Sequence, residues 1–476
     1  MPTHEAGALH APGYGSVAVV PAWLKPPADV NELLPELWAS SVVRNEAGAL
    51  EAGGVDVRDL AAQYGTPAYV LDEADLRERA AEFVAAFRDA FADSGAGADV
   101  YYASKAFVCT EVARWLSREG LRLDACTGGE LAVLLRAGVP PEDICLHGNN
   151  KSDAELGRAV SAGIGRIVID SLAEIDRLAA VAAEYGVTVP VLLRVTVGVE
   201  AHTHQYIATA HEDQKFGLSL SDGVAAEGVR RIIGRPGLEL VGLHSHIGSQ
   251  IFDTDAFEVS ARRLLGLHAR MQREHGIELP EVNLGGGFGI AYTSDHNPLS
   301  PKSLADSLAE IVRRECRGLG IDVPRVGVEP GRAIVGPSTF TLYSVGTIKE
   351  VRLEHDLTRL YVAVDGGMSD NIRTALYDAD YSCTVASRAS TATPVLARVV
   401  GKHCESGDVV VKDEFLPVDM AAGDLVAVPG TGAYCRSMAS QYNYVPRPPV
   451  ISVRDGVARV LLRRETEDDL LVLDVS

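Results

Sequence analysis

The sequence is poor in cysteine and has no long apolar run. Its seven cysteines are an odd number spread over 476 residues, unlike the even, closely spaced sets that staple small secreted domains. No stretch approaches the roughly 20 apolar residues of a membrane helix. The N-terminal sequence MPTHEAGALHAPGYG has neither the basic start nor the apolar run of a secretory signal. We therefore expect a cytoplasmic protein without a disulfide framework.

Positive charge is scarce relative to negative charge. The chain has 44 Lys and Arg against 65 Asp and Glu, which gives a net charge of −21. Nucleic-acid binding needs clustered Lys and Arg to displace counterions, so this balance argues against such a partner. The hydrophobic fraction of 47% and the charged fraction of 23% are ordinary for a globular enzyme. The length allows two sizeable hydrophobic cores.

Short apolar runs alternate with helical patterns through the middle of the chain. Helical segments such as SLAEIDRLAAVAAEYG place apolar residues three to four positions apart. The apolar runs, which we interpret as strands, are VYYASK, LRLDACT, ICLHG, RIVID, VPVLLRV, LVGLHSHIG, VNLGGGFG and RVGVEPG. An open doubly wound sheet would also alternate, but eight units without a nucleotide fingerprint at the first turn favour closure. We predict an α/β fold with a (β/α)8 TIM barrel over residues 67–335.

The C-terminal part of the chain has a different pattern. TFTLYSVGTIKEVR, RLYVAVDGG, TPVLARVVGKHC and GDLVAVPGTGAY are rich in β-forming residues and lack long helical patterns. We predict a mostly β domain over residues 336–476, joined by the segment 41–66 that precedes the barrel. Residues 1–40 start with a stretch rich in Gly, Ala and Pro, which predicts a partly disordered N-terminal extension.

Polar residues gather where the predicted barrel strands end. Active sites in such barrels lie at the C-terminal ends of the strands, and strands that only build a core would not need polar residues there. The residues at these ends are Lys105, Asp124, His147, Arg194, His246, Glu329 and Arg332. We therefore predict a catalytic site at this end of the barrel.

Three of these residues, and the glycine-rich segment after one predicted strand, also have a structural explanation when taken alone. Lys105 ends a strand that should be buried, where a lowered pKa would suit imine formation with an aldehyde, but a lysine there can also extend to solvent. Glu329 can pair with an arginine or with a ring nitrogen. His246 can be a core residue or stack on a flat cofactor. Gly285–Gly287 can form a tight turn or a phosphate-binding loop.

Five motifs in one order reduce these alternatives. YYASKAF, HSHIGSQ, NLGGGFG, EPGR and GKHCESGD together resemble the alanine-racemase-like, fold-type III decarboxylases that use pyridoxal 5'-phosphate (PLP). This family includes diaminopimelate, ornithine and arginine decarboxylases. The resemblance covers roughly residues 54–450 and implies a PLP enzyme, with no metal in its site.

The resemblance implies roles for the residues around the cofactor. Lys105 is similar to the lysine that holds PLP as a Schiff base, His246 to the histidine that stacks on the pyridine ring, and Glu329 to the carboxylate paired with the ring nitrogen. The implied phosphate ligands are Ser249 and the amides of Gly286 and Gly287.

Two further residues would come from the β domain. Cys404 resembles a catalytic cysteine that reaches the PLP of the neighbouring subunit, and Tyr434 resembles a tyrosine close to cofactor and substrate. The resemblance therefore implies a homodimer with shared active sites. Cysteines 126 and 435 also fall near the predicted site, where either can be an inert small side chain.

The substrate is indicated by the groups expected at its far end. VDGGMSDNIRTALYDADY closely resembles the diaminopimelate decarboxylases, and EAHTHQYIATAHEDQKFGLSL (residues 200–220) resembles their actinobacterial branch. The resemblance implies that Arg332, Arg373 and Tyr377 bind a distal carboxylate, while Glu405 binds the distal ammonium. Arg332 could equally serve the PLP phosphate.

The resemblance implies decarboxylation of meso-2,6-diaminopimelate to L-lysine and CO2, the last step of lysine biosynthesis. Two alternatives remain open. One is a related decarboxylase of ornithine, arginine or lysine, which would not need Arg373 and Tyr377. The other is a non-catalytic regulatory protein on the PLP fold, which would have no use for Lys105, Glu329 and Cys404 together.

Overall fold

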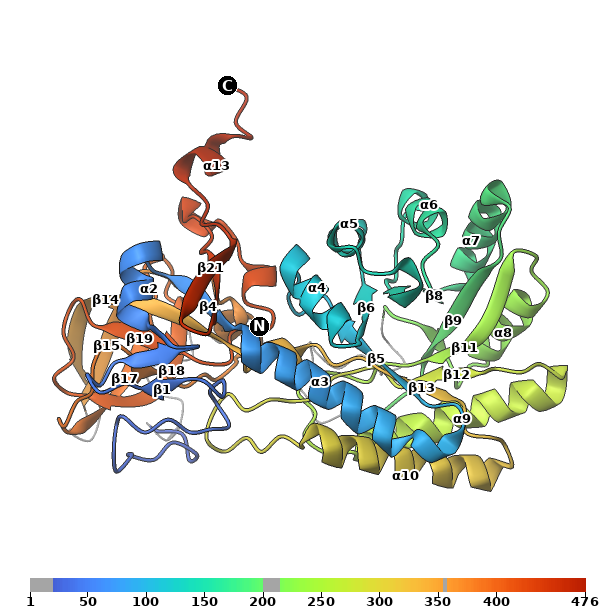
Figure 1. The fold of residues 1–476 in the computed structure, drawn as a ribbon, viewed down its shortest axis with the longest axis horizontal. Helices are drawn as coiled ribbons and strands as arrows, with labels where there is room; N and C mark the ends of the chain where they lie inside the picture. Colours follow the sequence, from blue (N-terminus) through green and yellow to red (C-terminus); the bar gives the residue numbers. More distant parts are fainter. Residues whose placement is uncertain (1–19, 200–214, 354–357) are drawn as a thin grey trace, which may run out of the picture. The chain divides into compact units, whose positions relative to one another are not determined.

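The structure is a computed structural model that describes residues 20–199, 215–353 and 358–476. The chain divides into two compact units, and Figure 1 labels many of their helices and strands. The barrel unit comprises Arg77–Ile290 and Pro298–Ile334, and the β unit comprises Met1–Leu76, Ala291–Asn297 and Val335–Ser476. Over the described ranges, no helix combines the length and apolar character needed to cross a membrane.

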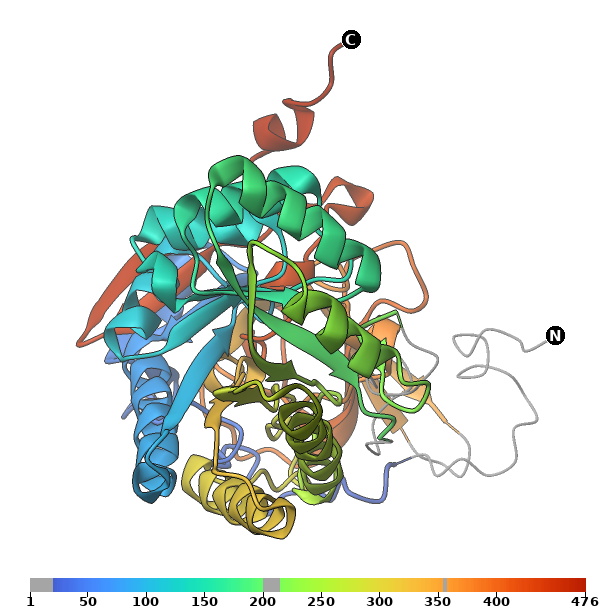
Figure 2. The same ribbon diagram turned by 90° about the vertical axis from the view of Figure 1, so that its right-hand side faces the viewer.

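The barrel unit contains a closed parallel sheet, as the alternation predicted. Its strands follow the order β9-β11-β12-β13-β5-β6-β7-β8, and pairing of β8 with β9 closes the circle. Figure 2 shows these strands at the centre, with helices around them. The bounds are β5 Ala98–Ala103, β6 Arg122–Ala125, β7 Ile144–Leu146, β8 Arg166–Ile169, β9 Val189–Thr196, β11 Leu238–His244, β12 Glu281–Asn283 and β13 Arg325–Val328; β10, Leu218–Ser219, adds to β9. Each lies within or overlaps a run that the apolar pattern singled out, apart from β10.

The helices of the barrel unit begin and end where capping chemistry directs. Ser152, Ser171 and Ser300 each accept a hydrogen bond from a first-turn amide, which satisfies a donor that has no partner inside the helix. Glycines in the left-handed conformation end several of them, as Gly186 does for α7. The bounds are α3 Glu73–Ala90, α4 Thr110–Arg118, α5 Gly128–Ala137, α6 Asp153–Ala162, α7 Leu172–Tyr185, α8 Val224–Ile233, α9 Asp255–His275, α10 Pro301–Leu319 and α11 Arg332–Val335.

The β unit is built on a mixed sheet with the order β18-β17-β15-β14-β4-β20-β21, and β19 joins β14 to β16. The bounds are β4 Ala68–Asp72, β14 Thr339–Arg352, β15 Thr358–Val364, β16 Thr384–Val385, β17 Pro394–Val400, β18 Val409–Pro417, β19 Leu425–Val428, β20 Val450–Arg454 and β21 Val457–Leu462. A small second sheet holds β1 Val43–Arg44, β2 Leu50–Ala52 and β3 Val55–Asp56, and the helices are α2 Val57–Tyr64, α12 Arg373–Tyr377 and α13 Glu467–Leu471.

The start of the barrel differs from the predicted boundary at residue 67. Strand β4 pairs antiparallel with β14 and parallel with β20, so it belongs to the sheet of the β unit, and the barrel unit begins at Arg77. The N-terminal segment also differs from the expectation for residues 1–40. Leu37 and Trp38 are buried in the apolar core of the β unit, so the latter part of that segment helps to build the fold. Residues 1–19 lie outside the described ranges.

Candidate active site

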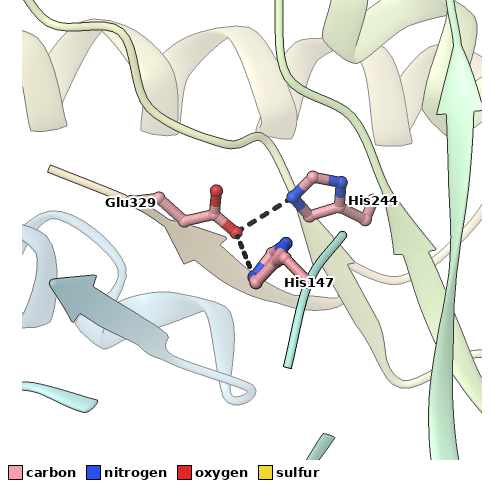
Figure 3. A group of neighbouring side chains, drawn as sticks. All are labelled: His147, His244 and Glu329. Carbon is pink, nitrogen blue, oxygen red and sulfur yellow. Dashed lines mark hydrogen bonds and ion pairs between the residues drawn. The ribbon is translucent and has the colours of Figure 1, made fainter. Parts of the chain in front are cut away.

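The C-terminal ends of three barrel strands bring a carboxylate and two imidazoles together. Glu329 directly follows β13, His244 ends β11 and His147 directly follows β7. Figure 3 shows both rings pointing toward one oxygen of the carboxylate. Glu329 Oε1 lies 2.9 Å from His244 Nε2 and 3.4 Å from His147 Nε2. All three side chains are buried, so the carboxylate is held in one orientation.

The histidines keep Glu329 ionised although it is buried. Burial raises the pKa of a carboxyl group, but His244 and His147 outweigh this effect and hold the pKa of Glu329 well below its usual value. Burial lowers the pKa of His147 well below its usual value, against the opposing effect of the charge of Glu329. Burial, and then the charge of Glu329, raise the pKa of nearby Asp124 well above its usual value. The cluster therefore concentrates one negative charge on Glu329.

The same three side chains have the composition of a metal-ligand set. Their donor atoms lie within 4.8 Å of one another, and two imidazoles with a carboxylate suit several transition metals. The 2.9 Å contact between His244 and Glu329 is, however, a direct hydrogen bond, so these two atoms are each other's partners. We assign the cluster to holding the charge of Glu329.

Lys105 lies in a turn immediately after β5. Two backbone hydrogen bonds fix this turn, from the Ala103 amide to the Pro330 carbonyl at 3.1 Å and from the Ala106 amide to the Ala103 carbonyl at 3.0 Å. The Lys105 ammonium lowers the pKa of Glu329, against the larger effect of burial. The predicted lysine and the predicted carboxylate therefore share one electrostatic environment at the same end of the barrel.

The glycine-rich loop after β12 packs tightly against its neighbours. A Cβ on Gly286 would clash with the carbonyl oxygen of Glu329, and one on Gly287 would clash with that of Gly248. The Gly286 amide donates a hydrogen bond of 3.2 Å to His246 Nδ1, so this ring nitrogen is an acceptor. Burial lowers the pKa of His246 well below its usual value. The loop thus brings bare backbone close to a neutral, oriented imidazole.

Two predicted anion-binding residues contact each other beside this loop. Arg332 Nη2 donates a hydrogen bond of 2.8 Å to Ser249 Oγ, and Arg332 is 5% exposed. Another residue from the predicted set of strand ends has a different role: Arg194 lies 3.7 Å from Asp170 and over the ring of Phe216, 4.4 Å from its centroid. Arg194 therefore has a carboxylate and an aromatic partner of its own.

The residues of the barrel end fit PLP. A buried carboxylate held as an anion suits a protonated ring nitrogen, a neutral imidazole suits the flat ring, and a hydroxyl with a guanidinium suits a phosphate. Backbone without side chains lets a phosphate approach closely. A lysine near the carboxylate completes the set. These features belong to Glu329, His246, Ser249, Arg332 and Lys105.

A second group of predicted residues meets within the β unit. Arg373 opens α12, and its Cζ lies 5.6 Å from the ring centre of Tyr377 and 5.8 Å from that of Tyr434. Tyr292, which sequence reasoning missed, lies 5.5 Å from the same carbon. Tyr381, also missed, accepts a hydrogen bond from Arg373 Nε at 2.8 Å. The guanidinium therefore sits among four tyrosines.

The position of the missed residues explains why they were missed. Tyr381 ends the segment NIRTALYDADY, and Tyr292 follows GGGFG by a few residues. Both residues lie beside a motif without being part of the pattern that defines it. His244 likewise lies inside HSHIGSQ. A tyrosine or histidine beside a motif carries no signal of its own, because its role depends on which side chain the fold places next to it.

Cys404 and Glu405 are exposed on the connection between β17 and β18. The Cys404 amide donates a hydrogen bond of 3.2 Å to Asn443 Oδ1, and the ring of neighbouring His403 lies 5.4 Å from that of Tyr442. The predicted catalytic cysteine thus presents an accessible thiol on a surface turn. The segment thought to mark the actinobacterial branch lies, for residues 200–214, outside the described ranges.

Comparisons with known proteins agree with this geometry. Residues 75–336 match the family model described as pyridoxal-dependent decarboxylase, pyridoxal binding domain. The chain is 55% identical over 453 residues to a diaminopimelate decarboxylase of Mycobacterium tuberculosis, covering 94% of this chain and 100% of the relative. It is 53% identical to that of Mycobacterium leprae over the full length of both. It also resembles diaminopimelate decarboxylase from M. jannaschii solved with L-lysine, with TM-score 0.85, 30% identity and coverage of 92% and 99%.

Proposed function

Because this chain belongs to the diaminopimelate decarboxylases, a family of pyridoxal-dependent enzymes, we propose that it converts meso-diaminopimelate to L-lysine and CO2. One observation in the structure carries the choice of substrate. Arg373 is 5% exposed, and among the ion pairs of the described residues none joins it to a carboxylate. A buried cation without a carboxylate partner is costly, and the second carboxylate of diaminopimelate would compensate it.

The barrel unit holds the cofactor through residues with separate tasks. PLP supplies an electron sink for the electron pair that stays behind when CO2 leaves. Lys105 would hold the cofactor through its side-chain amine. Glu329, kept anionic by its histidines, holds the proton on the ring nitrogen, and His246 covers the ring. Ser249, Arg332 and the amide of Gly287 bind the phosphate, and Gly286, which has no side chain, lets it approach.

The contact of Arg332 with Ser249 supports a phosphate role for this arginine over a role in substrate binding. The orientation of the Gly286 amide toward His246 leaves Gly287 as the more direct backbone donor of the loop. Both residues of the loop stay in the proposed phosphate site, because their missing side chains are what lets the phosphate approach.

Residues of the β unit bind the far end of the substrate. Arg373 binds the distal carboxylate, with Tyr377 as a hydroxyl donor and Tyr434 close to both cofactor and substrate. Fork geometry makes arginine suited to a carboxylate. Glu405 binds the distal ammonium, and Cys404 returns a proton to the carbon that has lost CO2. Both act from the partner subunit, so the enzyme works as a homodimer with shared sites. We place this homodimer in the cytoplasm.

Replacing Arg373 with glutamine tests the distal-carboxylate assignment. The loss of a desolvated charge pair costs about 3 kcal/mol, so we expect kcat/KM for diaminopimelate to fall roughly 100-fold, chiefly through KM. Steady-state kinetics of the PLP-loaded protein measure this. Arg463→Gln is the matched control, since Arg463 is an exposed arginine of the same unit paired with Asp469, and it should leave kinetics unchanged. Unchanged kinetics in the Arg373 variant would contradict its assignment to the distal carboxylate.

A further inference from the structure

A closed ring of hydrogen bonds surrounds Arg373 in the β unit. Arg373 Nε lies 2.8 Å from Tyr381 OH, and Tyr381 OH lies 3.7 Å from Cys435 Sγ. Cys435 Sγ lies 3.5 Å from Asn371 Oδ1, which also accepts a hydrogen bond of 3.2 Å from the backbone amide of Arg373. All four residues are buried. The arginine is therefore held at its backbone and at its guanidinium by one connected network.

The direction of each hydrogen bond in this ring follows from the groups present. A guanidinium can only donate, so the Tyr381 oxygen accepts from Arg373. The phenolic proton is then directed to the sulfur of Cys435, and the thiol proton to the amide oxygen of Asn371. Burial raises the pKa of Tyr381 well above its usual value, so the phenol keeps the proton that this arrangement requires.

The ring determines which edge of the guanidinium meets a ligand. Nε is bound by Tyr381, and the two Nη atoms form the fork that pairs with a carboxylate. The rings of Tyr292, Tyr377 and Tyr434 surround the Cζ atom, and Tyr292 also packs edge-on against Tyr381 with centroids 4.9 Å apart. Rotation of Arg373 would break a buried hydrogen bond and disturb this aromatic packing.

We propose that Tyr381 and Cys435 are positioning residues that aim Arg373, and through it give the enzyme its selectivity for ligands with a carboxylate at the distal end. This inference rests on the proposed function. It also gives Cys435 a role: the thiol links Tyr381 to Asn371, and its complete burial keeps it from reagents in solvent.

Tyr381→Phe tests the proposal, because it removes one oxygen and keeps the ring that packs on Tyr292. L-lysine retains the carboxylate that does not react, whereas 1,5-diaminopentane has none, so the two are used as competitive inhibitors of the PLP-loaded enzyme. We expect the KM for diaminopimelate and the Ki of L-lysine to rise about 10-fold. The kcat and the Ki of 1,5-diaminopentane should change less than about 2-fold.

Cysteine variants provide an independent test with a built-in rescue. Cys435→Ala breaks the ring and should raise the Ki of L-lysine about 3-fold, whereas Cys435→Ser keeps a donor and an acceptor and should stay close to the parent. Tyr64→Phe is the control for loss of a tyrosine hydroxyl in the same unit, since its partner is the Ala458 carbonyl at 3.3 Å. It should leave both Ki values unchanged.

The outcomes separate this proposal from the proposed function. If Arg373→Gln impairs binding of L-lysine but Tyr381→Phe and Cys435→Ala do not, the ring does not position the arginine. Equal weakening of both inhibitors by Tyr381→Phe would indicate general damage and also overturn the proposal. If Arg373→Gln itself has no effect, the distal-carboxylate assignment fails first. Should Tyr381→Phe not fold, the comparison of Cys435→Ala with Cys435→Ser decides.

Discussion

Replacing Lys105 with alanine lowers kcat for diaminopimelate by at least about 1,000-fold, because this one side chain both binds the cofactor and moves protons in the reaction. Its place after β5, in the electrostatic field of Glu329, is what makes it the attachment point. Borohydride reduction followed by mass spectrometry should find the cofactor attached to Lys105 in the parent and nowhere in the variant. Lys302→Ala removes a lysine whose side chain is 78% exposed and should change neither result.

The Lys105 variant also tests whether active sites are shared between subunits. When it is mixed with a Cys404→Ala variant under conditions that allow subunit exchange, half of the dimers are hybrids and one of their two sites is intact. We expect about a quarter of the parent activity to return in a closed two-fold dimer. No recovery despite exchange would mean that Lys105 and Cys404 act within the same chain, whereas full activity of the Cys404→Ala variant by itself would mean that Cys404 has no catalytic role.

Glu329→Gln has the second largest expected effect, a fall in kcat of about 100- to 1,000-fold. Glutamine keeps the size of the side chain but removes the negative charge that holds the ring-nitrogen proton. Reduction with borohydride should still label Lys105, so that cofactor attachment and loss of turnover are separated. The matched control is Glu174→Gln on α7. Glu174 is a buried carboxylate of the same unit and pairs with Lys151 at 2.7 Å. This variant should lower the thermal stability and change kcat little.

The pH dependence of kcat and of stability tests whether Glu329 stays ionised. Its pKa is lowered in the folded protein by His244 and His147, against burial, so the carboxylate stays ionised at every pH above its usual range. Any stability that this charge contributes is present above the unfolded pKa and is lost only as the pH falls through the lower folded value. The kcat profile should therefore show no inflection from Glu329 near neutral pH. Near-parental turnover in Glu329→Gln would contradict the role assigned to this residue.

The sequence predicted the barrel well because local patterns determine it. Each of its strands is a short apolar run followed by an amphipathic helix, and both signals lie within a few residues. The placement of β4 needed information from far along the chain, because its partners are β14 and β20. Trp38 was likewise assigned to a loose extension, although distant residues such as Phe340, 5.9 Å away between ring centres, bury it. Pairings of this range are not visible in a local pattern.

The same difference between local and long-range information applies to the residues of the candidate site. Glu329, His246 and Lys105 could be named because motifs carry them, and the structure brings them to one end of the barrel. Tyr381 and His244 act by touching a motif residue, Arg373 and Glu329 respectively, and only a fold can show that contact. Residues that support a site are therefore the part that the sequence alone does not reveal.

The most direct test of the proposed function is the release of CO2 and L-lysine from meso-diaminopimelate by the PLP-loaded protein, with ornithine, arginine and lysine measured in parallel. We predict turnover of diaminopimelate alone. Turnover of only a basic amino acid would keep the cofactor site and contradict the roles of Arg373 and Tyr377, whereas no turnover of any of the four would contradict an enzymatic function and favour a regulatory protein on the same fold.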